Sequence, residues 1–274
     1  MPREKDWVFG RKINKYYMMK KLLLLLLVPF AVWANPINQN CPQFVLRGAP
    51  ESSLPANMTQ YICKTNYAVH YRYDTRTAEY VVEHVRMENI TGPAKRRDDF
   101  RADPAVHPEF RSTLQDYARS GYDRGHLAAG ANNNGNDQIM SESFFLSNMV
   151  PQNPNHNRGI WRILEERIRD LVIEGKDIYL ITGTVYQQGY GTIGDNRVGI
   201  PQAMWKVIVD RKGAKGIAFL IPNQPVPLED LPRYVVSIRQ IEQITGINFH
   251  PQLPAQLERV ETEVNPALWH GLVR

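Results

Sequence analysis

The sequence predicts an α+β fold with an antiparallel sheet at its core. Five segments rich in β-branched and aromatic residues are bounded by Gly, Asn, Asp or Pro, which is typical of strands joined by turns. One strong amphipathic pattern indicates a helix among these segments. No internal repeat or low-complexity tract interrupts the chain after residue 34, and about 240 residues suit one domain with a sizeable core.

Residues 1–34 are typical of a signal peptide. Two lysines precede an apolar run from Leu22 to Trp33, and the run ends in the small-x-small pattern of a signal-peptidase site, so we expect cleavage after Ala34. The run is shorter than the roughly 20 residues of a membrane span, which disfavours an uncleaved anchor. We therefore expect export to the periplasm or the medium, without stable membrane association. The polar stretch before Met18 indicates a start codon assigned too far upstream.

The charge of the chain depends on this leader. The whole sequence carries 33 basic and 28 acidic residues, but residues 1–34 hold seven basic groups and two acidic ones, so 26 of each remain. Overall charge therefore gives no argument for nucleic-acid binding, and any attraction to phosphate must come from local clusters. Basic clusters occur at Lys95-Arg96-Arg97 and at Arg158, Arg162, Arg167 and Arg169. Each could equally be a solvated surface.

The two cysteines, Cys41 and Cys63, both follow the predicted leader. In an exported protein we expect one disulfide, which closes a loop of about 20 residues and is worth roughly 3 kcal/mol on the chain-entropy estimate. A metal site built on these two cysteines is disfavoured, because no second Cys or His pair has the required spacing. We expect residues 35–66 to form an N-terminal extension and residues 67–274 to form the catalytic domain.

The expected elements follow in order along the domain. Strands are predicted at residues 67–73, 80–87, 178–182, 205–210 and 217–221. A helix is predicted over residues 158–174, where large apolar residues recur at spacings of three and four until Gly175 stops the pattern. A second helix is predicted over residues 231–244, ahead of Gly246. Residues 189–194 match the dinucleotide pattern G-x-G-x-x-G, but no helix can begin there, so we interpret this segment as a loop.

The most informative motif is Asp123-Arg124-Gly125-His126. An unperturbed imidazole titrates near pH 6.5, so His126 is a natural general base. Arg124 offers a forked donor to phosphate oxygens, and Gly125 permits backbone geometry that a Cβ would obstruct. Asp123 either orients the segment or caps a turn, and we favour the cap.

An Asn-rich segment and the predicted helix complete the set of candidate residues. Amide oxygens are hard ligands that suit Mg²⁺ or Ca²⁺, although an isolated Asn is more often a cap or turn residue. Asn157, Trp161, Glu165 and Arg169 recur every four residues and should share one side of the helix. Glu165 can hold metal-bound water or fix Arg169 in an ion pair; as a mere surface pair the two would contribute little.

These residues resemble the DNA/RNA non-specific endonucleases of the ββα-metal (His-Me finger) superfamily, which include the secreted Serratia-type nuclease and mitochondrial endonuclease G. The resemblance covers roughly residues 67–251. Residues 123–126 correspond to the DRGH signature of the family, and residues 205–208 and 241–246 resemble its C-terminal landmarks. A second block follows at Leu146, Ser147, Asn148, Pro151, Gln152, Asn157, Gly159, Trp161, Leu164 and Glu165. The cysteines do not match the disulfides expected for the Serratia-type enzyme.

The resemblance implies a role for each candidate. His126 would be the general base, Asn157 the Mg²⁺ ligand, and Glu165 the residue that positions metal-bound water. Asn148 would support the site, while Arg124 and Arg169 would contact substrate. The upstream arginine of the family aligns with either Arg96 or Arg97. Mn²⁺ or Ca²⁺ could substitute for Mg²⁺, and a homodimer is compatible with the sequence.

The sequence thus predicts an exported, Mg²⁺-dependent endonuclease that cleaves DNA and RNA and leaves 5′-phosphate and 3′-hydroxyl ends, the end chemistry being implied by the resemblance. A more selective phosphodiesterase with the same metal site is an alternative. A nucleic-acid-binding module without catalysis is a second alternative, disfavoured because every expected catalytic residue type is present.

Overall fold

The computed structural model describes residues 35–212, 214–269 and 271–273, which belong to a single compact unit. The predicted signal peptide, residues 1–34, lies outside the described residues. No helix in the described part of the chain is both long enough and apolar enough to cross a membrane.

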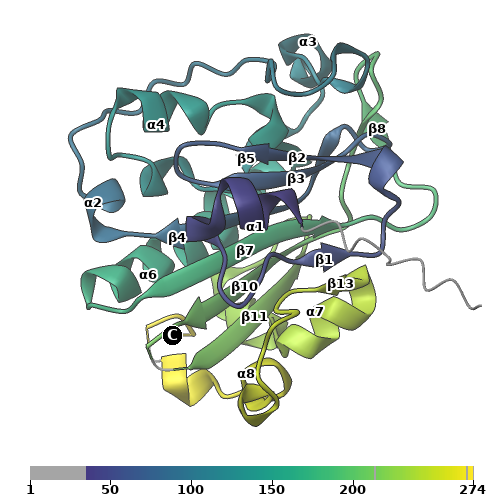
Figure 1. Ribbon diagram of the computed structural model, residues 1–274. Helices are drawn as coiled ribbons and strands as arrows, with labels where there is room; N and C mark the ends of the chain where they lie inside the picture. Colours follow the sequence, from purple (N-terminus) through teal and green to yellow (C-terminus); the bar gives the residue numbers. More distant parts are fainter. Residues whose placement is uncertain (1–34, 213, 270, 274) are drawn as a thin grey trace, which may run out of the picture. The chain divides into compact units, whose positions relative to one another are not determined.

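A seven-stranded antiparallel sheet forms the core of this unit, in the order β12-β11-β10-β7-β4-β3-β2 (Figure 1). All five predicted strands are confirmed, with ends shifted by a few residues; the outer strands β2 and β12 were not predicted. The strands are β2 Thr59–Cys63, β3 Ala68–Arg72, β4 Thr77–Val85, β7 Ile178–Val185, β10 Ala203–Asp210, β11 Lys215–Pro222 and β12 Val235–Val236.

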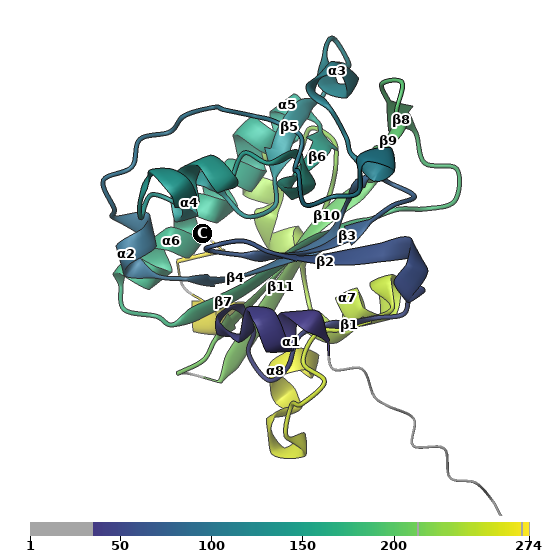
Figure 2. The same cartoon turned by 45° about the horizontal axis from the view of Figure 1, so that its top comes forward.

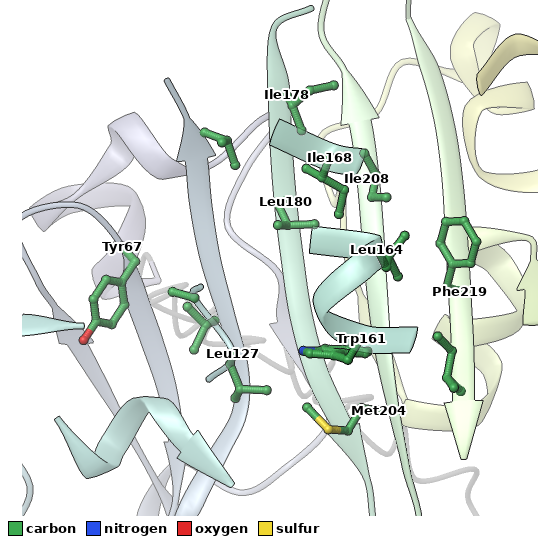
Figure 3. Packing of buried hydrophobic residues seen from close by; sticks show 14 of the residues in the cluster. Tyr67, Leu127, Trp161, Leu164, Ile168, Ile178, Leu180, Met204, Ile208 and Phe219 are labelled. Atoms are coloured by element: carbon green, nitrogen blue, oxygen red, sulfur yellow. The ribbon is translucent and has the colours of Figure 1, made fainter. Parts of the chain in front are cut away.

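The two faces of the sheet bury different apolar clusters, because side chains alternate along each strand. On one face, Met204 and Ile208 of β10 pack with Leu164 and Ile168 of helix α6, Arg162–Ile173, as Figure 3 shows. On the other face, Trp205, Val207 and Val209 face a second cluster. That cluster includes residues of α1 Pro36–Asn40, α7 Ile238–Thr245 and α8 Arg259–Thr262.

A small two-stranded sheet leads into α6. Strand β5, Asp123–His126, pairs antiparallel with β6, Met149–Gln152. The chain then continues through α5, Pro154–His156, and a π-helical turn, Asn157–Trp161, before α6 begins. The helix predicted over residues 158–174 is confirmed in extent, but its first part is irregular because Gly159 has the non-helical angles φ −101° and ψ −113°. Asn157 therefore precedes this break, and the predicted regular four-residue climb starting from it was wrong.

The N-terminal segment is part of the same unit. The disulfide between Cys41 and Cys63 is confirmed, with an S–S distance of 2.04 Å. Ile37 and Phe44 are fully buried in the second apolar cluster, and β2 forms an edge of the main sheet. Residues 35–66, which we expected to be an extension, thus contribute to the core.

The second predicted helix, over residues 231–244, is confirmed only in its second half. Residues Leu228–Tyr234 form a 3-10 helix and strand β12 follows, so α7 begins only at Ile238. Pro232 cannot donate in a regular helix, whereas Ser237 and Gln240 form a capping box that starts a new one. Gly246 ends α7 with φ +70°, as expected for a glycine cap.

The remaining segments are short. Residues 189–194 form a loop that enters the hairpin of β8, Thr192–Ile193, and β9, Val198–Gly199, which confirms that no helix starts there. Strands β1 Glu51–Ser52 and β13 Ile247–Asn248 pair with each other. The other helices are α2 Met87–Ile90, α3 Leu114–Tyr117 and α4 Asp137–Glu142. Further 3-10 turns span Pro42–Phe44, Ala56–Met58, Pro108–Phe110, Gly130–Asn132, Leu146–Asn148, Ala255–Leu257 and Pro266–Trp269.

Candidate active site

A cavity of about 520 Å³ opens where β5 meets the start of the α5–α6 segment. Figure 2 shows β5, β6 and α5 together at this end of the molecule. The predicted residues Arg96, Arg124 and Asn157 all line the cavity. Its other walls come from Asp98, Phe100, Tyr117, Ala118, Arg119, Tyr122, Asp123 and Arg158. The cavity is therefore rich in guanidinium groups, which suits a phosphate ligand.

His126 ends β5, opposite Met149 of β6. Its ring makes edge contacts with Phe144 and Phe100, at centroid distances of 5.1 and 5.8 Å. Nε2 is buried and has no hydrogen-bond partner among the described residues. Burial, followed by the positive charges of Arg96 and Arg124, lowers the pKa of His126 to about 3. The imidazole is therefore neutral at pH 7 and retains the ability to accept a proton.

Asp123 holds the side chain of Asn157. The Asn157 Nδ2 donates to Asp123 Oδ2 at 2.9 Å, and Arg158 donates to the same carboxylate through Nε and Nη2 at 2.8 and 2.6 Å. Burial opposes ionisation, but the hydrogen bonds from Arg158 and Asn157 outweigh it and lower the pKa of Asp123. Because a carboxylate only accepts, the amide is oriented with Oδ1 as its free acceptor. Asp123 orients a neighbouring side chain, so our preference for a turn cap was wrong.

Asn148 is fully buried and uses its whole amide internally. Its Oδ1 accepts from the Ala128 backbone N–H at 2.8 Å, and its Nδ2 donates to the carbonyls of Ala128 and Ser143, both at 2.9 Å. It therefore fixes the chain two residues beyond His126. Asn148 is therefore buried away from any ligand, and its role in supporting the site stays a prediction.

Gly125 allows β5 and β6 to approach closely. A Cβ at this position would lie 1.9 Å from Oε1 of the buried Gln152. We expect Gly125→Ala to lower the free energy of unfolding by about 1–3 kcal/mol, because the added methyl group must displace a packed side chain. Urea denaturation measures this change. Gly191→Ala is the control, since its Cβ would meet only the end of Ile200 at 3.3 Å; equal losses in both variants would contradict the steric explanation.

Within the part of the chain that the structure describes, Glu165 and Arg169 form no ion pair with each other. Glu165, whose side chain is 15% exposed, instead lies beside Lys206 of β10, with Oε1 3.6 Å from Nζ. Arg169 Nη1 donates to Asn132 Oδ1 at 3.4 Å. Burial raises the pKa of Glu165, against the opposing charges of Lys206 and Arg169. Of the two roles considered for Glu165, the ion pair with Arg169 is therefore not formed, and the sequence pattern did not identify Lys206 as the partner.

The structure separates the two upstream arginines. Arg96 lies over the Phe144 ring at 5.1 Å, lines the cavity and contributes to the shifted pKa of His126. Arg97 points elsewhere, because its Nη1 pairs with Asp137 Oδ2 at 3.3 Å. Arg124 lies over Phe100 at 4.2 Å. Two further arginines, Arg119 and Arg158, line the cavity but were not predicted to belong to the site, since sequence spacing alone does not show which loops converge.

The donor set fits a hard divalent cation. Asn157 presents a free amide oxygen held in place by an anionic carboxylate, whereas the Glu165 carboxylate lies beside Lys206, with Oε1 3.6 Å from Nζ. Oxygen donors of this kind suit Mg²⁺, Mn²⁺ or Ca²⁺, and Mg²⁺ keeps most of its shell as water. No group of three or more His, Cys, Asp and Glu side chains that could hold a metal occurs within the described residues. A site here therefore relies on the single amide.

Comparison with known proteins agrees with this geometry. Residues 49–256 match the family described as DNA/RNA non-specific endonuclease. Human mitochondrial endonuclease G is 36% identical over 217 residues, covering 73% of this chain and 72% of its own. A nuclease from a Nostoc species is 30% identical over 271 residues, covering 89% of this chain and 98% of its own.

Other relatives are longer. The mitochondrial nuclease EXOG of Xenopus laevis is 36% identical over 211 residues, which is 71% of this chain but 58% of that protein. Among solved structures, a chain of the EndoG/EndoGI complex superimposes with a TM-score of 0.69 at 28% identity, covering 82% of this chain and 95% of that one. The fold similarity therefore extends over most of the described unit.

Proposed function

Because the chain belongs to the DNA/RNA non-specific endonuclease family, we propose that it is a metal-dependent endonuclease that hydrolyses DNA and RNA with little sequence preference. The observation that carries this proposal is the neutral His126, its Nε2 unbonded, beside a cavity that holds several guanidinium groups and the free amide oxygen of Asn157. A base, cations and a hard-metal ligand are the groups that phosphodiester hydrolysis requires.

In the proposed reaction His126 accepts the proton of the attacking water. A base with a pKa near 3 would be weak, but two of the causes of that low value are the nearby charges of Arg96 and Arg124. A bound phosphodiester is an anion that offsets these charges, so the imidazole becomes more basic when substrate is present. Burial between aromatic rings keeps the ring neutral until then.

Arg96 and Arg124 bind the phosphate in this proposal. Each guanidinium rests on an aromatic ring, Phe144 or Phe100, which holds it at the cavity wall. Arg96 donates through Nε to Asp98 Oδ1 at 2.8 Å, which leaves its two Nη groups for the phosphate. Forked donors at the non-bridging oxygens stabilise the charge that grows during displacement. Arg169 donates to Asn132 Oδ1 at 3.4 Å and does not line the cavity, so we propose that it acts through its positive charge.

Asn157 Oδ1 would hold the cation, which we propose to be Mg²⁺, with Mn²⁺ or Ca²⁺ as substitutes. When bound, Mg²⁺ supplies a Lewis acid for the phosphate and for the leaving 3′ oxygen. Asp123 keeps the amide oriented, and Glu165, which lies beside Lys206, offers its carboxylate to water in the site. The products expected from departure of the 3′ oxygen are 5′-phosphate and 3′-hydroxyl ends.

We also propose that the protein is exported. The disulfide between Cys41 and Cys63 supports an oxidising compartment, because such bonds are rare in proteins kept reduced. The relatives include proteins named as mitochondrial, so location differs within the set of similar proteins. Fractionation of cells that produce the full chain would test export.

The protein from Asn35 onward should degrade both supercoiled plasmid and RNA in Mg²⁺, and EDTA should stop both reactions. Mapping the ends with a phosphatase-dependent ligation assay should show 5′-phosphates. Cleavage that continues in EDTA would contradict the role of the metal. Activity on small diesters with intact plasmid and RNA would replace the proposal with a selective phosphodiesterase.

A further inference from the structure

Lys206 is a fully buried charge at the centre of the main sheet. Its Nζ donates to Thr182 Oγ1 of the neighbouring strand at 3.1 Å and lies 4.4 Å from the centre of the Trp161 ring. The adjacent positions on the same face of β10 are Met204 and Ile208, both buried in the apolar cluster. An isolated ammonium in such a place is costly, and an apolar residue would pack there at least as well.

Two acidic residues face this ammonium from opposite elements. Glu165 of α6 places Oε1 3.6 Å from Nζ, and Glu83 of β4 is buried on the same face of the sheet. Glu83 Oε2 accepts from Asn132 Nδ2 at 3.1 Å, and Asn132 also receives the hydrogen bond from Arg169. These five side chains, Glu83, Asn132, Glu165, Arg169 and Lys206, form one cluster, called here the buried polar cluster after its fully buried members Glu83, Asn132 and Lys206.

The buried polar cluster reaches the surroundings of His126. Asn132 ends the 3-10 turn Gly130–Asn132, and a Cβ at Gly130 would lie 3.6 Å from His126 Nε2 and 3.5 Å from Arg96 Nη1. Lys206 therefore pairs with Glu165 on the helix, while Glu83, on which the charge of Lys206 also acts, is bonded to Asn132 in the turn beside His126.

We propose that Lys206 is a positioning residue whose ammonium holds the Glu165 carboxylate in place and balances its charge, so that Glu165 can order water in the site. This inference rests on the proposed nuclease function. Lys206 itself is too deeply buried to touch nucleic acid.

The charges of the cluster support this assignment. Burial raises the pKa of Glu83 to about 7, although Lys206 and the Asn132 hydrogen bond oppose that rise. Glu83 is therefore harder to ionise than an exposed glutamate, and Glu165 is the acidic residue that forms the ion pair with Lys206. Burial lowers the pKa of Lys206, and Glu165 followed by Glu83 opposes that change. Arg169 and Glu166 are the other charged groups that act on Glu165.

A double-mutant cycle in the protein from Asn35 onward tests the inference. Lys206→Met should lower kcat on plasmid DNA by about 10- to 100-fold, the range found when partners of metal-site groups are removed, with little change in KM. In the Glu165→Gln background the same change should cost less than about threefold, because a neutral side chain no longer needs the ammonium. Equal losses in both backgrounds would overturn the inference.

Two controls separate this role from folding. Ile208→Ala removes a buried side chain from the same face of β10 and should lower the melting temperature without reducing kcat at a temperature where the variant is folded. Lys206→Gln keeps a donor for Thr182 and replaces Lys206→Met if that variant does not fold. The inference would also be overturned if Ile208→Ala lowered kcat as much as the Lys206 variant does.

A measurement without substrate or metal keeps the inference independent of activity. The ¹³C NMR signal of the Glu165 carboxyl carbon can be assigned because it is missing from the spectrum of Glu165→Gln. Its chemical shift at pH 7 should be that of an ionised carboxylate in the wild type and that of a protonated carboxyl group in the Lys206 variant. An ionised Glu165 in both proteins would overturn the role of Lys206. Inactivity of the wild type in every divalent metal would instead overturn the proposed function, and the carbon signal would still decide on Lys206.

Discussion

Replacing His126 with alanine is expected to lower kcat for plasmid cleavage by about 10²- to 10⁴-fold, the usual contribution of a general base. Nε2 of His126 is the buried ring nitrogen that no described residue binds, so the variant loses the group proposed to accept the proton of water. Affinity for DNA should change little, because the guanidinium groups of Arg96 and Arg124 remain on their aromatic supports. Cleavage kinetics in Mg²⁺ and a gel-shift assay in EDTA measure the two effects separately.

The position of the ring supplies the control for this experiment. His126 packs against Phe144 and Phe100, so its removal leaves space that free imidazole can enter. Imidazole added at millimolar concentration should restore part of the lost activity of His126→Ala and should not stimulate the wild type. A variant that retains full activity would remove His126 from the mechanism.

The main sheet was predictable because its strands carry local signals. Residues 178–182 and 205–210 combine β-branched and aromatic residues with clear boundaries, and both became long central strands, β7 and β10. Edge strand β2 was missed since Thr59–Cys63 lies in a polar, proline-flanked stretch whose pairing depends on Ala68–Arg72 across a turn. Pairing partners of this kind do not appear in a local pattern.

The predicted helix boundaries were wrong where a single residue interrupts the helix despite a continuous apolar periodicity. The apolar spacing over residues 231–244 ignores Pro232, and the capping box at Ser237 resets the start of α7. Gly159 likewise interrupts a pattern that reads as continuous, and it sets Asn157 apart from the helix that carries Glu165. Backbone exceptions at a site are expected where geometry serves the ligand rather than the helix.

The candidate site was predictable in its residue types and less so in its contacts. Arg124 and Asn157 line one cavity, and His126 does not line it but contacts Phe100, which does. The partners that orient them do not follow from spacing: Asp123 binds Asn157 across 34 positions, and Lys206 meets Glu165 from the opposite side of the core. Such pairs arise only once the small β5–β6 sheet and α6 have packed against the main sheet.

Asn157→Ala is expected to lower kcat at least about a hundredfold, because a metal that stabilises the transition state by several kcal/mol loses its one proposed protein ligand, and each 1.4 kcal/mol is a factor of ten. The affinity for Mn²⁺, measured by its electron paramagnetic resonance signal in the absence of DNA, should fall in parallel. His126→Ala should leave that affinity unchanged. Unaltered Mn²⁺ binding in Asn157→Ala would place the metal ligand elsewhere.

The variant Asp123→Ala tests how much the orientation of the Asn157 amide matters while the amide itself is still present. This variant keeps the Asn157 amide but frees it to rotate, so Mn²⁺ affinity should fall by about 10- to 100-fold and high metal concentration should restore cleavage. Asn157→Ala should not recover in the same way, since no oxygen remains at that position. Arg158→Ala is the matched control, because Arg158 shares the Asp123 carboxylate and is largely exposed, where such pairs contribute little. A metal defect in Arg158→Ala as large as that of Asp123→Ala would mean that the ion pair, rather than the bond to Asn157, is what the site depends on.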